Sequence, residues 1–287
     1  MTVTLFLITL VALIMQPPFA KIYNQKTGNK CAYLYSALLS FFAMLFFVVS
    51  GLLSGGLHFT TEFIIYSVFF ALAYGTASVS NLTALRHGSM AITTLIVNLS
   101  LMIPTLYGII FLGEPTSVWL YLGIAFLVIA LFLVNYQKSQ NTNKVTFIWV
   151  ILTILAAVGN GMCSTVQKVE QVAMNGQYKN EFMIVALLIV TFIFLIFSFS
   201  TERKDIKPTL KKGIYFPIIV GALNGTVNLL VMVLGNMMPV SLLFPLLTSG
   251  GIIGNYFLSR FYFKEKLSTV QTMGLIAGII AVVFFNI

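Results

Sequence analysis

Long runs without charged residues alternate with short charged segments along the whole 287-residue chain. A helix needs about 20 apolar residues to cross the hydrocarbon layer of a membrane. The run 213–259 is long enough for two such helices, and its sequence LGNMMP at 234–239 is typical of a turn. The pattern predicts ten transmembrane helices, which we number as spans 1 to 10. The nine runs that lack Asp, Glu, Lys and Arg are 1–20, 31–61, 63–85, 87–113, 115–137, 145–167, 182–201, 213–259 and 267–287.

These runs do not have the pattern of a transmembrane β-barrel. Strands of such barrels are about 10 residues long and alternate apolar with polar side chains, whereas the runs here are longer and do not alternate. The first run also lacks the basic leader and the small-residue cleavage site of a signal peptide, so we expect it to be a span. The predicted fold class is an all-α integral membrane protein.

One short sequence occurs twice, at corresponding places in the two halves of the chain. FLGEPTSVWLYLG at 111–123 matches YFKEKLSTVQTMG at 262–274, and each copy ends one apolar run and opens the next. The polar segment QKSQNTNK at 137–144 leaves five spans on either side. Because five is an odd number, the second half enters the membrane from the opposite face. We therefore predict two inverted five-helix repeats, 1–136 and 145–287, joined by a polar linker.

The repeat also aligns polar residues at the ends of spans 4 and 9. It places Glu114 at the position of Glu265, and Ser117 at the position of Ser268. A serine just before a helix accepts hydrogen bonds from the first N–H groups of that helix, so we expect these serines to be the N-caps of spans 5 and 10. For the two glutamates we predict a structural role at helix ends. The alternative is that they close gates on the two faces of the membrane.

Composition and charge support a membrane location. Only 8% of the residues are charged, whereas soluble domains contain about 25%. The net charge of +9 comes from basic residues scattered over short loops, which does not fit a nucleic-acid-binding face. Of the 16 Lys and Arg residues, 14 lie in loops that follow odd-numbered spans. The positive-inside rule places these loops in the cytoplasm, which predicts a multi-pass protein of the cell membrane, in contact with membrane lipid, with both termini outside.

Polar side chains inside spans indicate a binding site, because they are costly in lipid. Asn or Gln occurs inside spans 1, 3 and 4, and again inside spans 6, 8 and 9, which correspond to them under the repeat. Other polar residues follow at spacings that fall on the same helix face. We predict a polar cavity for a small-molecule substrate; the alternative is that the amides only bridge helices. The predicted substrate-binding residues are Gln16, Tyr74, Ser78, Asn81, Thr94, Asn98, Asn160, Ser164, Gln167, Asn224, Asn228 and Thr248.

The sequence shows no residues arranged for catalysis or metal binding. No Asp or Glu lies well inside a predicted span, so we expect no carboxylate that relays protons. The motifs G-x-x-x-x-G-K, H-E-x-x-H and G-x-S-x-G are not found. His58 and His87 lie at helix ends, and Cys31 and Cys163 form no motif. We predict that the protein is not an enzyme and uses no cofactor or metal.

Helix-breaking and small residues lie in several of the same spans. Pro104, Pro217 and Pro245 suit spans that bend or rock, although plain packing would also accommodate them. The sequence GLIAG at 274–278 forms a small-residue face that would support a homodimer. A monomer is the alternative.

These features resemble the drug/metabolite transporter superfamily in its EamA-domain branch. The sequences ALRHGSMAITTLIVNLSLMIPTLYGIIFLGEP at 84–115 and GNMMPVSLLFPLLTSGGIIGNYFLSRFYFKEKLS at 235–268 are similar to the helix 4 and helix 9 regions of that family. The resemblance implies two inverted five-helix halves around a cavity lined by helices 1, 3, 4, 6, 8 and 9. It also implies cytoplasmic termini, opposite to the charge count. Small multidrug relatives exchange protons through a glutamate in the first helix, and span 1 has no acid here.

From these observations we predict a secondary transporter, either an exporter or an exchanger. It would carry a small polar metabolite by alternating access between the inverted repeats. The substrate classes that remain open are amino acids, nucleosides, sugar derivatives and anions. The alternative function is a non-transporting membrane subunit or a component of a lipid-headgroup flippase.

Overall fold

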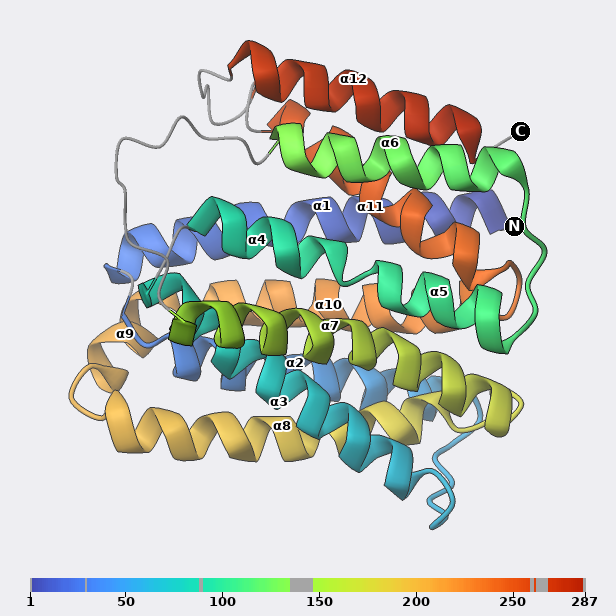
Figure 1. Cartoon of the computed structure of the whole chain (residues 1–287). Helices are drawn as coiled ribbons and strands as arrows, with labels where there is room; N and C mark the ends of the chain where they lie inside the picture. Colours follow the sequence, from blue (N-terminus) through green and yellow to red (C-terminus); the bar gives the residue numbers. More distant parts are fainter. Residues whose placement is uncertain are drawn as a thin grey trace. The chain divides into compact units, whose positions relative to one another are not determined.

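The computed structural model of the protein describes residues 2–28, 30–87, 90–134, 147–258, 261 and 268–285. Every regular element in these residues is a helix (Figure 1). The all-α fold class is therefore confirmed. The helices are α1 (Thr2–Thr27), α2 (Ala32–Leu53), α3 (Ile64–His87), α4 (Met90–Leu99), α5 (Met102–Phe111), α6 (Val118–Val134), α7 (Phe147–Ala173), α8 (Lys179–Thr201), α9 (Ile206–Gly213), α10 (Tyr215–Gly235), α11 (Val240–Phe257) and α12 (Thr269–Phe284).

Seven helices within the described ranges are long and apolar enough to cross a membrane. They are α1, α2, α7, α8, α10, α11 and the Ile64–Asn81 part of α3. Shorter apolar helical segments lie at Ile96–Phe111, Val118–Leu133 and Thr269–Phe284. The helices are therefore suited to a membrane location, as the composition predicts.

The chain divides into two compact units, and each unit combines parts of both predicted halves. Unit 1 comprises Met1–Gly75 and Val166–Met237, and unit 2 comprises Thr76–Thr165 and Met238–Ile287. The chain passes from one unit to the other inside α3, inside α7 and between α10 and α11. The predicted linker at 137–144 lies outside the described residues, and the division into two repeats stays a prediction.

In unit 1, two glycines of α10 allow this helix to pack closely against α2. A Cβ at Gly221 would lie 2.8 Å from the backbone oxygen of Leu39, and a Cβ at Gly225 would lie 2.6 Å from the ring of Phe46. Both distances are too short for a side chain, so a larger residue would force the helices apart. α10 also packs against α1 in this unit.

Unit 2 is built around the pair α6 and α12, with α11 packed against both. Ala130 of α6, Ile252 of α11 and Ala281 of α12 belong to one buried apolar cluster. A Cβ at Gly278 would lie 3.7 Å from Ile252 and 3.8 Å from Ala130, which is ordinary van der Waals contact. The small-residue face at 274–278 is thus covered by helices of the same chain. The choice between a monomer and a homodimer stays a prediction.

The predicted N-caps of α6 and α12 are confirmed. The Ser117 hydroxyl accepts a hydrogen bond from the Leu120 N–H at 3.1 Å. The Ser268 hydroxyl accepts the Gln271 N–H at 3.2 Å, and the Gln271 side chain accepts the Ser268 N–H at 2.9 Å, which together form a capping box. Glu265, the repeat partner of Glu114, lies outside the described residues.

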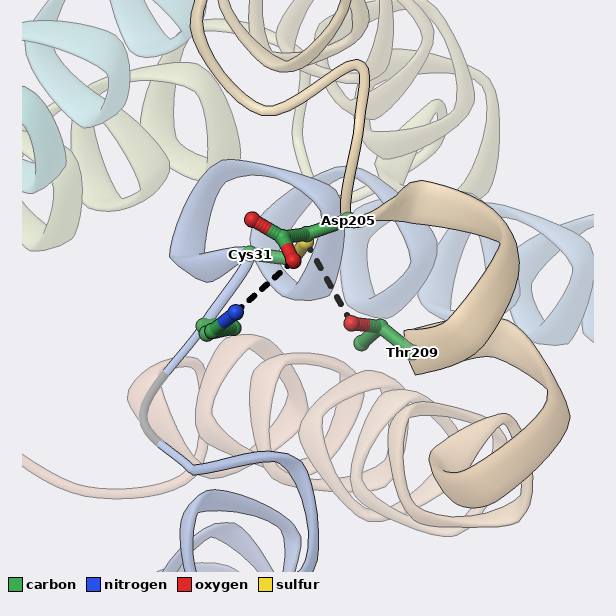
Figure 2. Close-up of polar contacts among 4 residues, drawn as sticks. Cys31, Asp205 and Thr209 are labelled. Atoms are coloured by element: carbon green, nitrogen blue, oxygen red, sulfur yellow. Dashed lines mark hydrogen bonds and ion pairs between the residues drawn. The ribbon is translucent and has the colours of Figure 1, made fainter.

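At one end of unit 1, α9 is joined to the loop between α1 and α2 (Figure 2). The Thr209 hydroxyl of α9 donates to the Sγ of Cys31 at 3.4 Å, and the Lys30 ammonium donates to the Asp205 carboxylate at 2.9 Å. Cys31 is buried with a left-handed backbone (φ 59°) just before α2. Burial raises the pKa of this thiol, and the hydrogen bond from Thr209 opposes that rise.

The loop between α2 and α3 meets α8 at its other end. The His58 N–H donates to the Glu181 carboxylate in the first turn of α8 at 2.8 Å. The loop after α1 (span 1) therefore lies beside the segment after α8 (span 7). The loop after α2 (span 2) lies beside the start of α8, which follows the loop after α7 (span 6), at the other end of these helices. This grouping matches the predicted division of the loops by charge. The exposed cations that follow α8 are Arg203, Lys204, Lys207, Lys211 and Lys212.

Candidate functional site

Four predicted site residues form a chain of hydrogen bonds across three helices of unit 1. The Asn224 amide of α10 donates to Gln16 Oε1 of α1 at 3.3 Å. Asn228, also on α10, donates to Asn224 Oδ1 at 3.0 Å and accepts from Gln167 Nε2 of α7 at 2.8 Å. Gln167 is 5% exposed, and the other three side chains are partly buried. The structure therefore brings these amides together, and in this arrangement they are bonded to one another.

The spacing of residues on α10 explains why these amides meet. Asn224 and Asn228 are four positions apart, so they lie on one face of the helix. Gly221 and Gly225 are also four positions apart, and they lie on the face that packs against α2. The glycine face fixes the distance to α2, while the amide face carries the hydrogen bonds to α1 and α7.

In unit 2, span 4 is interrupted at Ser100 and Leu101, between α4 and α5 (Figure 1). Pro104 explains this position, because proline has no N–H for the carbonyl four residues earlier and its ring crowds that carbonyl. The Ser100 carbonyl accepts the Ile103 N–H at 2.9 Å instead, as in a tightened turn. The helix is therefore interrupted one turn before Pro104, and whether this span moves stays a prediction.

Asn160 of α7 contacts this break. Its amide Nδ2 donates to the Ser100 hydroxyl at 2.8 Å. The next residue, Gly161, allows the close approach, because a Cβ there would lie 2.7 Å from the Ser100 carbonyl oxygen. A predicted site residue thus lies against an interrupted helix. Interrupted helices form the substrate sites of many secondary transporters. At this break the N–H groups of Ser100 and Leu101 are themselves bonded, to the carbonyls of Val97 and Asn98 at 3.2 and 3.4 Å.

The other predicted residues occupy varied surroundings. The Tyr74 ring in unit 1 stacks on Phe70 and meets Phe194 edge-on. Thr248 of α11 is buried and donates to the Phe244 carbonyl of its own helix at 2.8 Å. The Thr94 side chain lies outside the described residues. Ser78, Asn81, Asn98 and Ser164 are partly buried.

Of the twelve predicted residues, five belong to unit 1 and seven to unit 2. The unit 1 group is Gln16, Tyr74, Gln167, Asn224 and Asn228, and the unit 2 group is Ser78, Asn81, Thr94, Asn98, Asn160, Ser164 and Thr248. A single cavity formed by all twelve stays a prediction.

Sequence analysis missed a buried acid on α7. This helix continues beyond Gln167 to Ala173, and Glu170 on the extension is 0% exposed. Glu170 lies three residues before the end of α7, so the expectation that no acid lies well inside a span is not contradicted. The predicted span ends at Gln167 because the next residue, Lys168, is charged. The long stem of a lysine can carry its charge away from the helix, and here the Lys168 ammonium donates to the Gly235 carbonyl at the end of α10.

Comparisons with known proteins give a likeness of fold. No protein-family model matches the chain, and no curated protein matches it in sequence. The chain is similar to a solved structure described only as "Crystal structure of protein", with a TM-score of 0.77 and 14% sequence identity. The similarity covers 99% of this chain and 98% of that chain. The two proteins therefore share a fold over nearly their whole lengths.

Proposed function

We propose that this chain is a secondary transporter, an exporter or exchanger, of a small polar metabolite. Its ten spans would form two inverted five-helix repeats of the EamA-domain type that expose the site alternately on the two faces of the membrane. The seven long apolar helices and the three shorter apolar segments of the described residues support this proposal. The observation that carries the proposal is the interrupted span 4 with Asn160 against its break.

The chemistry of the amide chain suits a neutral or zwitterionic polar substrate. Each amide is both a donor and an acceptor. The bonds that Gln167, Asn224 and Asn228 make with one another keep these groups paired when no substrate is bound. A substrate that replaced these bonds with its own would avoid the cost of unpaired polar groups, which is about 1 to 3 kcal/mol for each group.

α7 links the two groups of polar residues. It carries Asn160 in unit 2 and Gln167 in unit 1, and the chain passes between the units at Val166. A change in α7 near this point would therefore affect both polar groups. This suits a protein that alternates between two arrangements. If the amides only bridged helices, the protein would keep a single arrangement of its helices. That result would favour the alternative function, a non-transporting subunit or a flippase component.

A thermal-shift screen against a metabolite library tests the proposal. A ligand present at 100 times its dissociation constant stabilises the folded protein by about 2.7 kcal/mol. We expect a small polar compound to raise the unfolding temperature of the purified wild-type protein, and to have little effect on Asn160→Leu or Asn228→Leu. The control is Thr226→Leu on α10, because the Thr226 hydroxyl donates to the Ala222 carbonyl of its own helix.

Two results would count against the proposal. In the first, no compound stabilises the wild-type protein. In the second, Asn160→Leu and Asn228→Leu unfold at lower temperature but respond to the compound as the wild type does. The second result would show that the amides only bridge helices, which is the alternative to a substrate-binding cavity.

A further inference from the structure

Glu170 differs from the other acidic residues that the structure describes. It is the one that combines complete burial with a side-chain oxygen, Oε1, that has no hydrogen-bond partner in the described part of the chain. The other five are either exposed or bonded to segments distant in the sequence. These five are Glu62, Glu114, Glu181, Glu202 and Asp205.

The neighbours of Glu170 leave its charge poorly compensated. Gln171 Nε2 donates to Glu170 Oε2 at 2.6 Å. Gln171 is itself only 3% exposed, and its Oε1 accepts from the exposed Asn236 at 3.1 Å. The ammonium of Lys168 donates to a backbone carbonyl of α10, and that of Lys179 donates to the Gly176 carbonyl at 3.4 Å. One amide is thus the hydrogen-bond donor that the structure gives to this buried carboxyl group.

Burying an ionised carboxylate with so few partners is costly, whereas a neutral acid avoids most of that cost. Protonation at Oε1 removes the charge and leaves one hydroxyl to be satisfied. The charged groups that face Glu170 from α8 are Lys179 and Glu181. The Glu181 carboxylate accepts the backbone N–H of His58. An anion at Glu170 would be attracted by the Lys179 ammonium and repelled by the Glu181 carboxylate, so burial remains the main cost of ionising it.

The burial of Glu170 also limits which ligand its carboxyl group can bind. No group of three or more His, Cys, Asp or Glu side chains able to hold a metal ion occurs among the described residues. Glu170 has no exposed surface through which an organic cation could reach it in this arrangement. A proton needs neither additional ligands nor a cavity.

We propose that Glu170 is a proton-binding carboxyl group that couples the transport cycle of this chain to protons. In the arrangement described here the proton, taken from water, resides on Oε1. The proton leaves when the carboxyl group becomes exposed to water near the turn between α7 and α8. Coupling, as opposed to proton binding, rests on the proposed transport function.

The position of Glu170 in the chain suits such a role. α7 passes between the two units at Val166, one helical turn before Glu170. The turn between α10 and α11, which contains Asn236, passes between the units at Met237. The hydrogen bond from the Asn236 amide to Gln171 Oε1 joins α7 to this turn, close to both points.

Infrared difference spectroscopy of the purified protein over a range of pH tests proton binding without a substrate. The protein should be held in a detergent without carbonyl groups, so that the stretching band of a protonated carboxylic acid is not obscured. We expect a pH-dependent acid band in the wild type that is lost in Glu170→Gln. Glu62→Gln, which changes an exposed acid, is the matched control and should keep the band. Glu170→Asp should restore an acid band at a shifted frequency.

The outcomes separate this inference from the proposed function. A spectrum of Glu170→Gln that matches the wild type, or a wild-type spectrum without an acid band, overturns the inference even if transport is observed. If Glu170→Gln does not fold, Glu170→Asp decides, because an unshifted band would exclude position 170 as its source. A band assigned to Glu170 in a protein that fails to transport would retain the proton site and remove the proposed coupling.

Discussion

The carboxylate of Glu114 accepts the backbone N–H of Ser241, 127 residues further along the chain, at 2.8 Å. Its other oxygen accepts the Val240 N–H at 3.0 Å. These N–H groups belong to the first turn of α11, where no carbonyl of the helix is available to them and negative charge is favoured. Glu202 binds the start of α2 in the same way. The two hydrogen bonds that Glu114 accepts from α11 fit the structural role predicted for this residue.

We expect Glu114→Ala to lower the free energy of unfolding by about 2 kcal/mol, because hydrogen bonds to a charged group are lost at a helix terminus. Denaturant titration in detergent micelles measures this change. Glu62→Ala, at an exposed glutamate, is the control and should change little. Equal stability of the two variants would show that the contact to α11 does not stabilise the fold. It would then favour the alternative hypothesis, in which Glu114 closes a gate.

Gly108 permits the contact between Glu114 and α11. A Cβ at this position would lie 2.5 Å from Glu114 Oε2 and 2.6 Å from Val240 Cγ2. Gly108→Ala should therefore destabilise the protein by about 1 to 3 kcal/mol through overpacking. Gly75→Ala is the control, because its Cβ would lie 3.8 Å from its nearest neighbour, Ile193. A neutral Gly108→Ala variant would contradict the packing described for unit 2.

Local pattern was sufficient for some of these features and not for others. Ser117 and Ser268 could be predicted as N-caps because a cap and its helix are adjacent in sequence. The amides Asn224 and Asn228 share a face because of their spacing, which is also local. The partner of Glu114 could not be predicted, because it depends on which helix N-terminus lies nearby in the folded chain.

The same limit applies to the contact between Asn160 and Ser100. Pro104 predicts a disturbed helix, but the pairing of Ser100 with Asn160 depends on the packing of α7 against the break. Glu170 was missed for a different reason. A charged residue predicts the end of a span, and this prediction fails where a lysine such as Lys168 directs its charge to a backbone carbonyl.

The thiol of Cys31 should react slowly with maleimides at neutral pH. Burial raises the pKa of this thiol, so less of the reactive thiolate is present at any given pH, and the rate should increase at a higher pH than the value of about 8.5 that is usual for a free cysteine. The measurement is labelling in a Cys163→Ser background. Thr209→Val should slow labelling further, since the Thr209 hydroxyl stabilises the thiolate. Faster labelling than in the detergent-denatured protein would contradict this.

The charge distribution predicts that the C-terminus lies outside the cytoplasm. Of the 16 Lys and Arg residues, 14 lie in loops that follow odd-numbered spans, which the positive-inside rule places inside. A reporter that fluoresces only in the cytoplasm should remain dark when it is fused after Ile287. Bright fusions would overturn the charge argument and restore the orientation implied by the resemblance to the EamA-domain branch.

The most direct test of the proposed function is uptake by the purified protein, reconstituted alone into liposomes, of a compound that stabilises it in the thermal-shift screen. We predict saturable uptake by the wild type and by Thr226→Leu. Uptake by Asn160→Leu at subsaturating concentration should fall about tenfold for each 1.4 kcal/mol of binding lost. Uptake by the wild type no faster than in liposomes without protein would contradict the account.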